Sequence, residues 1–164
     1  MEIAKRYFDV RSVITIIYCL AFATYILVGL QPAEAVQHSV DGVLRIPSIE
    51  LSVDVTALQL DGRELKTPDY IAGSYSGGRN KTLLIGHSTT AFKSLDDARI
   101  GDVVTYHDMA YKITEIEILP KVRISMSKLL SGSDKPTLVL MTCAGELLDN
   151  QDATHRLIVT SVAL

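Results

Sequence analysis

Residues 138–145 read LVLMTCAG, an apolar, strand-forming run that ends in threonine, cysteine and two small residues. Such a run, followed directly by small and polar residues, is typical of a buried strand that leaves the core at its C-terminal end. The chain contains only two cysteines, Cys19 and Cys143. The position of Cys143 at the exit of a predicted buried strand makes it either a small core residue or a nucleophile.

The other cysteine lies in an apolar segment near the N-terminus. Residues 12–30, SVITIIYCLAFATYILVGL, contain no charged side chain. A helix of this length would be roughly 28 Å long, which is close to the thickness of the hydrocarbon core of a bilayer. Basic residues precede the segment at positions 5, 6 and 11, and the next one is Arg45, so the positive-inside rule places the N-terminus in the cytoplasm. The sequence predicts a cytoplasmic N-terminus at 1–11, a transmembrane anchor at 12–30, a tether at 31–42 and an extracellular domain at 43–164.

A second interpretation of the N-terminal segment is a cleaved signal peptide. The stretch PAEA at residues 32–35 contains the A-x-A pattern that a signal peptidase cuts after Ala35. The apolar run is longer than the core of a typical signal peptide, so an uncleaved anchor in the cell membrane is favoured. In both interpretations Cys143 is exported, and a cysteine within the bilayer cannot form a disulfide bond with it.

Charge and composition exclude some functions of the exported part. It keeps 13 Lys and Arg residues against 16 Asp and Glu residues and has no basic run, which argues against a nucleic-acid-binding domain. The stretch 119–136 contains few acidic residues, so no calcium site is indicated there. We expect neither a metal nor a cofactor.

The exported part has the pattern of a mostly β fold with about eight short strands. Between Tyr111 and Leu119 the apolar alternation slips by one residue, which predicts a β-bulge or a strand that changes partners. Short helices are predicted only at 94–98 and at 125–130, the latter capped by Ser125. Many short strands separated by Gly, Asp and Pro turns indicate a closed or nearly closed β-barrel; the strands are predicted near residues 43–46, 51–55, 82–85, 102–107, 111–119, 137–142 and 157–162.

A catalytic Cys143 would need a base or a cation beside it, because a free thiol is mostly protonated at neutral pH. Four histidines lie after the anchor. His38 belongs to the tether, His107 lies in a predicted hairpin turn, and His155 precedes the last strand. His87, in LLIGHSTT, follows a glycine at the end of an apolar strand, which is the same local position as that of Cys143. His87 is therefore the candidate base. A histidine at the end of a strand is, however, equally often a structural residue whose side chain only forms hydrogen bonds with backbone groups.

Arg156 is the candidate cation. It opens the last predicted strand, and strands 137–142 and 157–162 are expected to form an antiparallel hairpin with a long loop. The last residue of one strand of a hairpin lies near the first residue of the next. Arg156 would then lie beside Cys143, where a guanidinium can hold a thiolate or an oxyanion.

The order of these elements resembles that of the sortases, membrane-anchored cysteine transpeptidases chiefly of Gram-positive bacteria. The family signature TLxTC is similar to Val139–Cys143, VLMTC, with valine in place of the first threonine. The segment LLIGHSTTAFKSLDDARIGDVVTY is similar to the loop that carries the family's histidine, and the N-terminal apolar segment matches the family's anchor. The resemblance covers residues 43–164 and implies an eight-stranded sortase-like β-barrel with short helices, preceded by one transmembrane helix.

The resemblance also implies roles for individual residues. Cys143 would be the nucleophile, His87 the acid/base and Arg156 the group that orients the substrate and stabilises the oxyanion, while Thr142 would add a contact to the substrate. The enzyme would cut an LPXTG-like sorting signal of secreted proteins between Thr and Gly. The resulting thioacyl enzyme would pass its acyl group to an amine of a cell-wall precursor or to a lysine of a pilin subunit.

Two other classes of function remain open from the sequence. One is a non-catalytic, membrane-tethered β-barrel that binds a peptide or a wall component, with Cys143 as a packing residue. The other is a hydrolytic cysteine peptidase, in which water instead of an amine resolves the thioester.

Overall fold

The computed structural model describes residues 39–58, 60–61, 64–65, 67–148 and 152–164. Residues His38–Leu164 form one compact unit. The anchor predicted at 12–30 lies outside the described residues, and among the described residues no helix is both long enough and apolar enough to span a bilayer.

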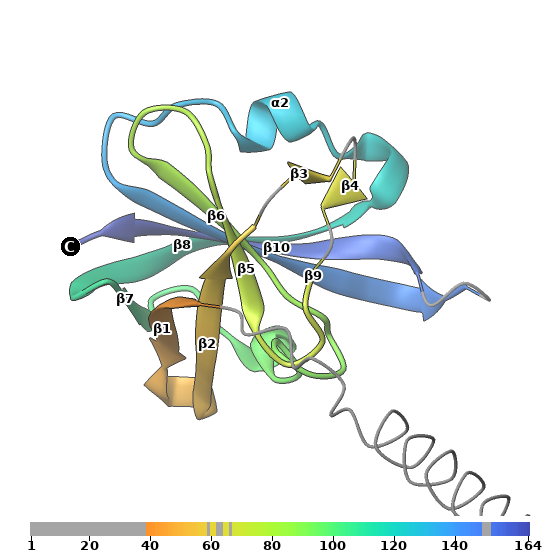
Figure 1. Cartoon of the computed structure of the whole chain (residues 1–164), viewed down its shortest axis with the longest axis horizontal. Helices are drawn as coiled ribbons and strands as arrows, with labels where there is room; N and C mark the ends of the chain where they lie inside the picture. The colour runs from red at the N-terminus through yellow and green to blue at the C-terminus, as the bar shows by residue number, and fades with distance from the viewer. Residues whose placement is uncertain (1–38, 59, 62–63, 66, 149–151) are drawn as a thin grey trace, which may run out of the picture. The chain divides into compact units, whose positions relative to one another are not determined.

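The unit is built around a closed β-barrel of eight strands in the order β1-β2-β5-β6-β9-β10-β8-β7 (Figure 1). Neighbouring strands are antiparallel except for the pairs β2–β5 and β6–β9, which are parallel. A separate two-stranded sheet, β3–β4, lies between β2 and β5 in the sequence. The strands are β1 Val40–Ile46, β2 Leu51–Ala57, β3 Leu60–Asp61, β4 Glu64–Leu65, β5 Ala72–Ser76, β6 Lys81–Ile85, β7 Val103–Tyr106, β8 Met109–Pro120, β9 Thr137–Leu147 and β10 Ala153–Ala163.

Helical structure is sparse in the described part of the chain, as predicted. It consists of three short 3-10 helices, η1 Pro47–Ile49, η2 Leu95–Asp97 and η3 Lys121–Arg123, and of one short α-helix, α2 Met126–Leu129. The predicted cap of the last helix is confirmed, because the Ser125 hydroxyl accepts a hydrogen bond from the backbone N–H of Lys128. The segment predicted as a helix at 94–98 contains only η2, whose Leu95 is buried.

The predicted mostly β fold is confirmed, and the barrel strands found by alternation are present. Strand β5, with the sequence AGSYS, was not predicted, because small and polar residues give it no apolar alternation. Strand β1 begins at Val40, so the last residues of the predicted tether belong to the barrel. Strands β9 and β10 also extend beyond their predicted ends, to Leu147 and from Ala153.

The phase slip in the sequence of β8 is a β-bulge. Opposite β10, Thr160 pairs with Glu115 while Ser161 pairs with Ile113, so that Thr114 has no direct partner. The bulge shifts the alternation: Ile113 is fully buried in the core before it, and Ile118 is largely exposed after it. The irregular pattern therefore had the predicted structural cause.

Strand β9 is buried on both faces, which explains its continuous apolar sequence. Leu138 and Leu140 belong to the main hydrophobic core. Val139 and Met141 belong to a second cluster, together with Leu83 and Ile158. Partly buried side chains from the segment between β8 and β9 pack against this second cluster, so that segment covers the outer surface of the barrel beside β9.

Candidate functional site

The alternation of side chains places Cys143 on the outer surface of the barrel. Successive residues of a strand point to opposite faces, and Val139 and Met141 both belong to the outer cluster. Two residues further along β9, Cys143 continues the same row. It is a free cysteine of intermediate exposure, in contrast to the buried Val139 and Met141 before it.

Strand register brings His87 to the same edge of the barrel. Strands β6 and β9 are parallel, with Leu83 opposite Val139 and Ile85 opposite Met141. The ladder continues past the end of β6, because the N–H of Gly86 donates a 3.2 Å hydrogen bond to the carbonyl of Met141. The next residues along the two segments are His87 and Cys143. The predicted meeting of the two strand ends is therefore confirmed.

A side-chain hydrogen bond reinforces this junction. The hydroxyl of Thr142 donates a buried 2.7 Å bond to the carbonyl of Gly86. Thr142 is only 3% exposed, so its hydroxyl bonds to the Gly86 carbonyl and not to solvent. The substrate contact expected of Thr142 remains a prediction.

The backbone around His87 is fixed by a compact turn. The carbonyl of His87 accepts hydrogen bonds from the N–H groups of Thr90, at 3.3 Å, and of Phe92, at 2.9 Å. Phe92 is 1% exposed and anchors the turn in the core. The imidazole, in contrast, belongs to a side chain that is 44% exposed, so protons can exchange with solvent there.

The segment before β5 contacts the imidazole of His87. Its Nε2 lies 3.2 Å from the carbonyl oxygen of Thr67 and 4.0 Å from a carboxylate oxygen of Asp69. No hydrogen bond joins His87 to Cys143 among the described residues. Thr67 and Asp69 were not identified from the sequence, because nothing in the pattern TPDY distinguishes it from an ordinary turn.

Arg156 is the direct cross-strand partner of Cys143, as predicted from the hairpin of β9 and β10. Side chains at such paired positions lie on the same face, with Cβ atoms about 4.5–5.5 Å apart. Ile158, two residues further along β10, belongs to the outer cluster, which places Arg156 on the outer face as well. The side chain of Arg156 is only 14% exposed.

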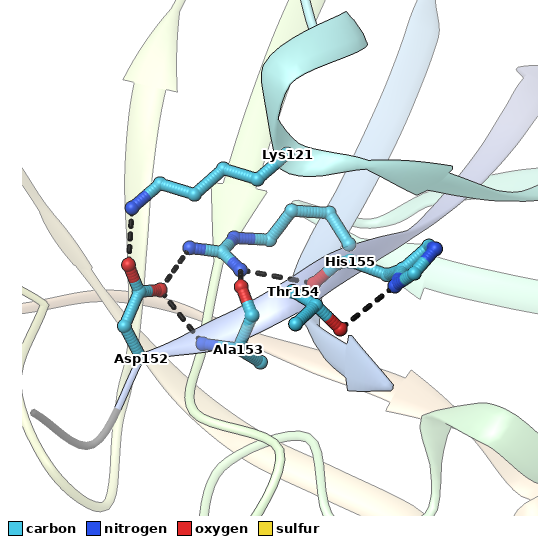
Figure 2. Close-up of polar contacts among 6 residues, drawn as sticks. Lys121, Asp152, Ala153, Thr154 and His155 are labelled. Atoms are coloured by element: carbon cyan, nitrogen blue, oxygen red, sulfur yellow. Dashed lines mark hydrogen bonds and ion pairs between the residues drawn. The ribbon is translucent and has the colours of Figure 1, made fainter. Parts of the chain in front are cut away.

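The guanidinium of Arg156 is held by the start of its own strand (Figure 2). Its Nη1 donates to the carbonyls of Ala153 and His155, both at 2.9 Å. Its Nη2 donates to a carboxylate oxygen of Asp152 at 2.5 Å. The other carboxylate oxygen of Asp152 accepts a hydrogen bond from the ammonium of Lys121, which belongs to η3. Hydrogen bonds from Lys121 and Arg156 hold the pKa of Asp152 well below its usual range.

A pocket of about 240 Å³ lies on the outer surface of the barrel, further back along β9. Its lining is mixed: charged and hydroxyl side chains surround five apolar ones, Leu119, Ile124, Leu129, Val139 and Ile158. Val139 is four residues before Cys143 on the same row of β9, which corresponds to about 13 Å of extended strand. The pocket therefore lies within reach of a short extended peptide whose scissile bond is at Cys143.

The remaining histidines that the structure describes are engaged elsewhere. His107 lies in the β7–β8 turn, where both central residues have positive φ, and its Nε2 is 3.4 Å from Asp41. His155 lies next to Arg156, but its Nδ1 is 2.8 Å from the hydroxyl of Thr154. His38 lies outside the described residues. In the described part of the chain no cluster of three or more His, Cys, Asp or Glu side chains is placed to hold a metal ion.

The geometry provides the groups needed for acyl transfer. A partly exposed cysteine lies between the segments that carry a partly exposed imidazole and a guanidinium, and a partly apolar pocket lies on the same face. A thiolate is the nucleophile in such chemistry, an imidazole can move the proton, and a guanidinium can bind the oxyanion.

Comparisons with known proteins agree with this geometry. A family model described as "Sortase domain" matches residues 44–163. Among solved structures, a lid mutant of sortase A from Corynebacterium diphtheriae is similar with a TM-score of 0.60 and 21% identity, over 80% of this chain and 73% of that one. Sortase C2 of pilus island 1 from Group B Streptococcus gives a TM-score of 0.58 and 20% identity, over 77% and 75% of the two chains. Sortase A from Listeria monocytogenes gives 0.58 and 17%, over 76% and 87%. No curated protein matches the chain significantly.

Proposed function

Because this chain belongs to the sortase family of cysteine transpeptidases, we propose that it cuts an LPXTG-like sorting signal of secreted proteins and joins the new carboxyl end to an amine. Cys143 is the nucleophile, His87 the acid/base and Arg156 the oxyanion ligand. The single observation that carries this assignment is the register of β6, β9 and β10, which brings three chemically suited side chains to one edge of the barrel.

In the first half-reaction, the Cys143 thiolate attacks the carbonyl carbon of the threonine in the sorting signal. The Thr–Gly C–N bond then breaks, and the His87 imidazolium gives its proton to the departing amine. The N–H groups of Arg156 stabilise the negative charge on the carbonyl oxygen while the tetrahedral intermediate exists. The products are a thioacyl enzyme and the released C-terminal peptide.

In the second half-reaction, the amine of a cell-wall precursor or of a pilin lysine attacks the thioester carbon. The C–S bond breaks, neutral His87 takes up the proton from the attacking nitrogen, and Cys143 returns to its starting form. The thioester keeps the acyl group reactive toward an amine, which is why covalent catalysis suits a transfer reaction.

The outer pocket supports recognition of a leucine-containing signal. In L-P-X-T-G the leucine lies three residues before the threonine whose carbonyl is attacked, and three extended residues span about 10 Å. The pocket around Val139 and Leu129 lies at a comparable distance from Cys143 along β9, and part of its lining is apolar. It is therefore the expected position of the leucine side chain.

We also propose that residues 12–30 anchor the enzyme in the cell membrane, with residues 1–11 in the cytoplasm and the catalytic domain outside. The absence of charge in this segment and the basic residues before it support this topology. Protease added to intact cells should then digest the catalytic domain, whereas a domain in the cytoplasm would be protected until the cells are lysed.

One experiment tests the chemistry and separates it from the alternatives. The full-length protein in detergent is incubated with an LPXTG-containing peptide, with and without triglycine as the amine, and all species are weighed by mass spectrometry. We expect a thioacyl adduct on the protein and an amine-linked product, both absent in Cys143→Ala. A free threonine carboxylate as the only product, even with the amine present, would indicate a peptidase. Neither adduct nor product would indicate a non-catalytic binding module.

A further inference from the structure

Asp152 occupies the centre of a three-residue cluster at the edge of the site. Its carboxylate accepts hydrogen bonds from the ammonium of Lys121 and from the guanidinium of Arg156. Figure 2 shows the carboxylate beside Lys121 and Ala153, and the N–H of Ala153 donates a 2.9 Å hydrogen bond to it. The Asp152 side chain is 19% exposed, whereas Lys121 is 54% exposed. The carboxylate is thus partly withdrawn from water and takes part in two ion pairs.

The hydrogen bonds of Arg156 leave part of its guanidinium available. An arginine has five N–H donors. Nη1 donates to two carbonyls of β10, and one N–H of Nη2 donates to Asp152. Among the described residues, the Nε–H and the second N–H of Nη2 have no acceptor. The Nε–H and this second N–H of Nη2 are therefore the donors left for a substrate oxygen.

Without Asp152, the two backbone carbonyls alone would have to orient the guanidinium. Arginine side chains have several rotatable bonds, and fixing them costs conformational entropy that a charged partner offsets. A fixed guanidinium also matters most for charge that develops only in the transition state, since donors that are already oriented need no reorganisation. Asp152 is therefore placed to affect catalysis without touching the reacting atoms.

The second partner of Asp152 connects this orientation to the pocket. Lys121 lies in η3 between Leu119 and Arg123, both of which line the pocket, and is followed closely by Ile124, which does so too. The carboxylate consequently links the segment that forms one wall of the pocket to the arginine beside Cys143.

We propose that Asp152 is a positioning residue: it fixes the guanidinium of Arg156 for oxyanion binding and, through Lys121, couples that orientation to the wall of the substrate pocket. This inference rests on the proposed transpeptidase function. It assigns to the residue directly before β10 a part in the chemical step that the sequence does not reveal.

The test is a double-mutant cycle on the full-length protein, with the LPXTG peptide and triglycine. Asp152→Asn keeps the shape of the side chain but removes its charge. We expect it to lower kcat by about 10- to 100-fold with little change in KM, which is somewhat less than the loss typical of removing an oxyanion donor itself. In an Arg156→Lys background the same change should have almost no further effect, because the planar guanidinium that Asp152 orients is already gone.

Two further variants guard against a purely structural explanation. Asp152→Glu retains the charge and should recover much of the lost kcat. Asp134→Asn is the matched control, because it removes the carboxylate of another Arg–Asp pair, an exposed one with Arg79 before the start of β9, and should leave kcat unchanged. Thermal unfolding of each variant shows whether the fold is intact.

Several results would overturn the proposal. If Asp152→Asn lowers kcat by the same factor in both backgrounds, Asp152 acts independently of Arg156. If kcat is unchanged in the wild-type background, Asp152 has no positioning role. Failure of the wild-type protein itself to form the amine-linked product would instead contradict the proposed function, so the two failures are distinguishable.

Discussion

Thr142 donates a buried 2.7 Å hydrogen bond to the carbonyl oxygen of Gly86, and each of these residues immediately precedes one of the two residues assigned to proton transfer and nucleophilic attack. The bond joins parallel strands that are far apart in the sequence. The positions of Cys143 and His87 therefore depend on each other through a contact that involves neither of their side chains.

Replacing Thr142 by valine should destabilise the protein and lower its activity. Valine has nearly the same shape as threonine but cannot donate, so the buried carbonyl of Gly86 loses its side-chain donor, at a cost of about 1–3 kcal/mol. We expect the free energy of unfolding in urea to fall by this amount and kcat to fall with it. Thr142→Ser keeps the hydroxyl and should retain more of the activity; equal loss of activity in both variants would contradict the role assigned to the hydrogen bond.

Replacing Gly86 by alanine should displace the turn that carries His87. A Cβ atom at this position would lie 2.8 Å from the ring of Phe92, and Phe92 is nearly fully buried, so the ring has little room to move. Overpacking of this kind typically costs about 1–3 kcal/mol. We expect reduced stability in urea and a lower kcat. Gly101→Ala controls for loss of stability alone: a Cβ there meets only one atom, at 4.0 Å, but the positive φ of Gly101 strains alanine, so stability should fall while kcat is retained. A fully active Gly86→Ala variant would show that the turn tolerates the shift.

Replacing Leu129 by serine should weaken substrate binding with little effect on the chemical step. Leu129 lines the outer pocket, and removal of its apolar surface lowers the affinity for the leucine of the sorting signal by about 1–3 kcal/mol. KM should therefore rise at least several-fold while kcat stays similar. Met126, in the same helix, does not line the pocket, so Met126→Ser is the matched control. A comparable rise in KM in both variants would indicate damage to the helix instead of to the pocket.

Asp152 should make the protein sensitive to acid. Its pKa in the folded state is lowered from the usual value of 3.8, first by Lys121 and then by Arg156. Its contribution to stability is therefore fully present above the unfolded-state pKa, and is lost as the pH falls below that value toward the folded-state pKa. We expect the free energy of unfolding of the wild type to decrease more steeply below about pH 4 than that of Asp152→Asn. Parallel pH profiles for the two proteins would contradict the assignment.

The elements that the sequence predicted correctly are those with a local signal. The apolar run before Cys143 indicated a buried strand, the slip after Ile113 indicated a bulge or a change of partner strand, and Ser125 indicated a helix start. The pairing of Arg156 with Cys143 followed from the expected antiparallel hairpin of the last two strands. Each of these inferences depended on neighbouring residues or on a single hairpin.

The features that the sequence did not reveal depend on contacts between distant segments. Strand β5 consists of small and polar residues, and its parallel pairing with β2 leaves no periodic trace. Lys121 and Asp152 are 31 residues apart. The four-residue spacing of Asp152 and Arg156 would predict a side-chain contact in a helix, but it does not do so in a strand. The outer pocket is lined by residues of four barrel strands, β6, β8, β9 and β10, and of the segment between β8 and β9, and no single stretch of sequence contains it.

The burial of β9 on two sides has a practical consequence for enzyme engineering. Positions 138, 140 and 142 point into the barrel, so substitutions there mainly affect whether the protein folds. Positions 139 and 141 lie on the outer face, in the row of side chains that ends at Cys143. Because these two side chains and Ile158 are buried in one hydrophobic cluster, a combinatorial library there that is confined to apolar residues should change the preferred recognition sequence while most of its members remain folded. Substitutions on the two faces of this strand should therefore affect two different properties, thermostability and substrate scope.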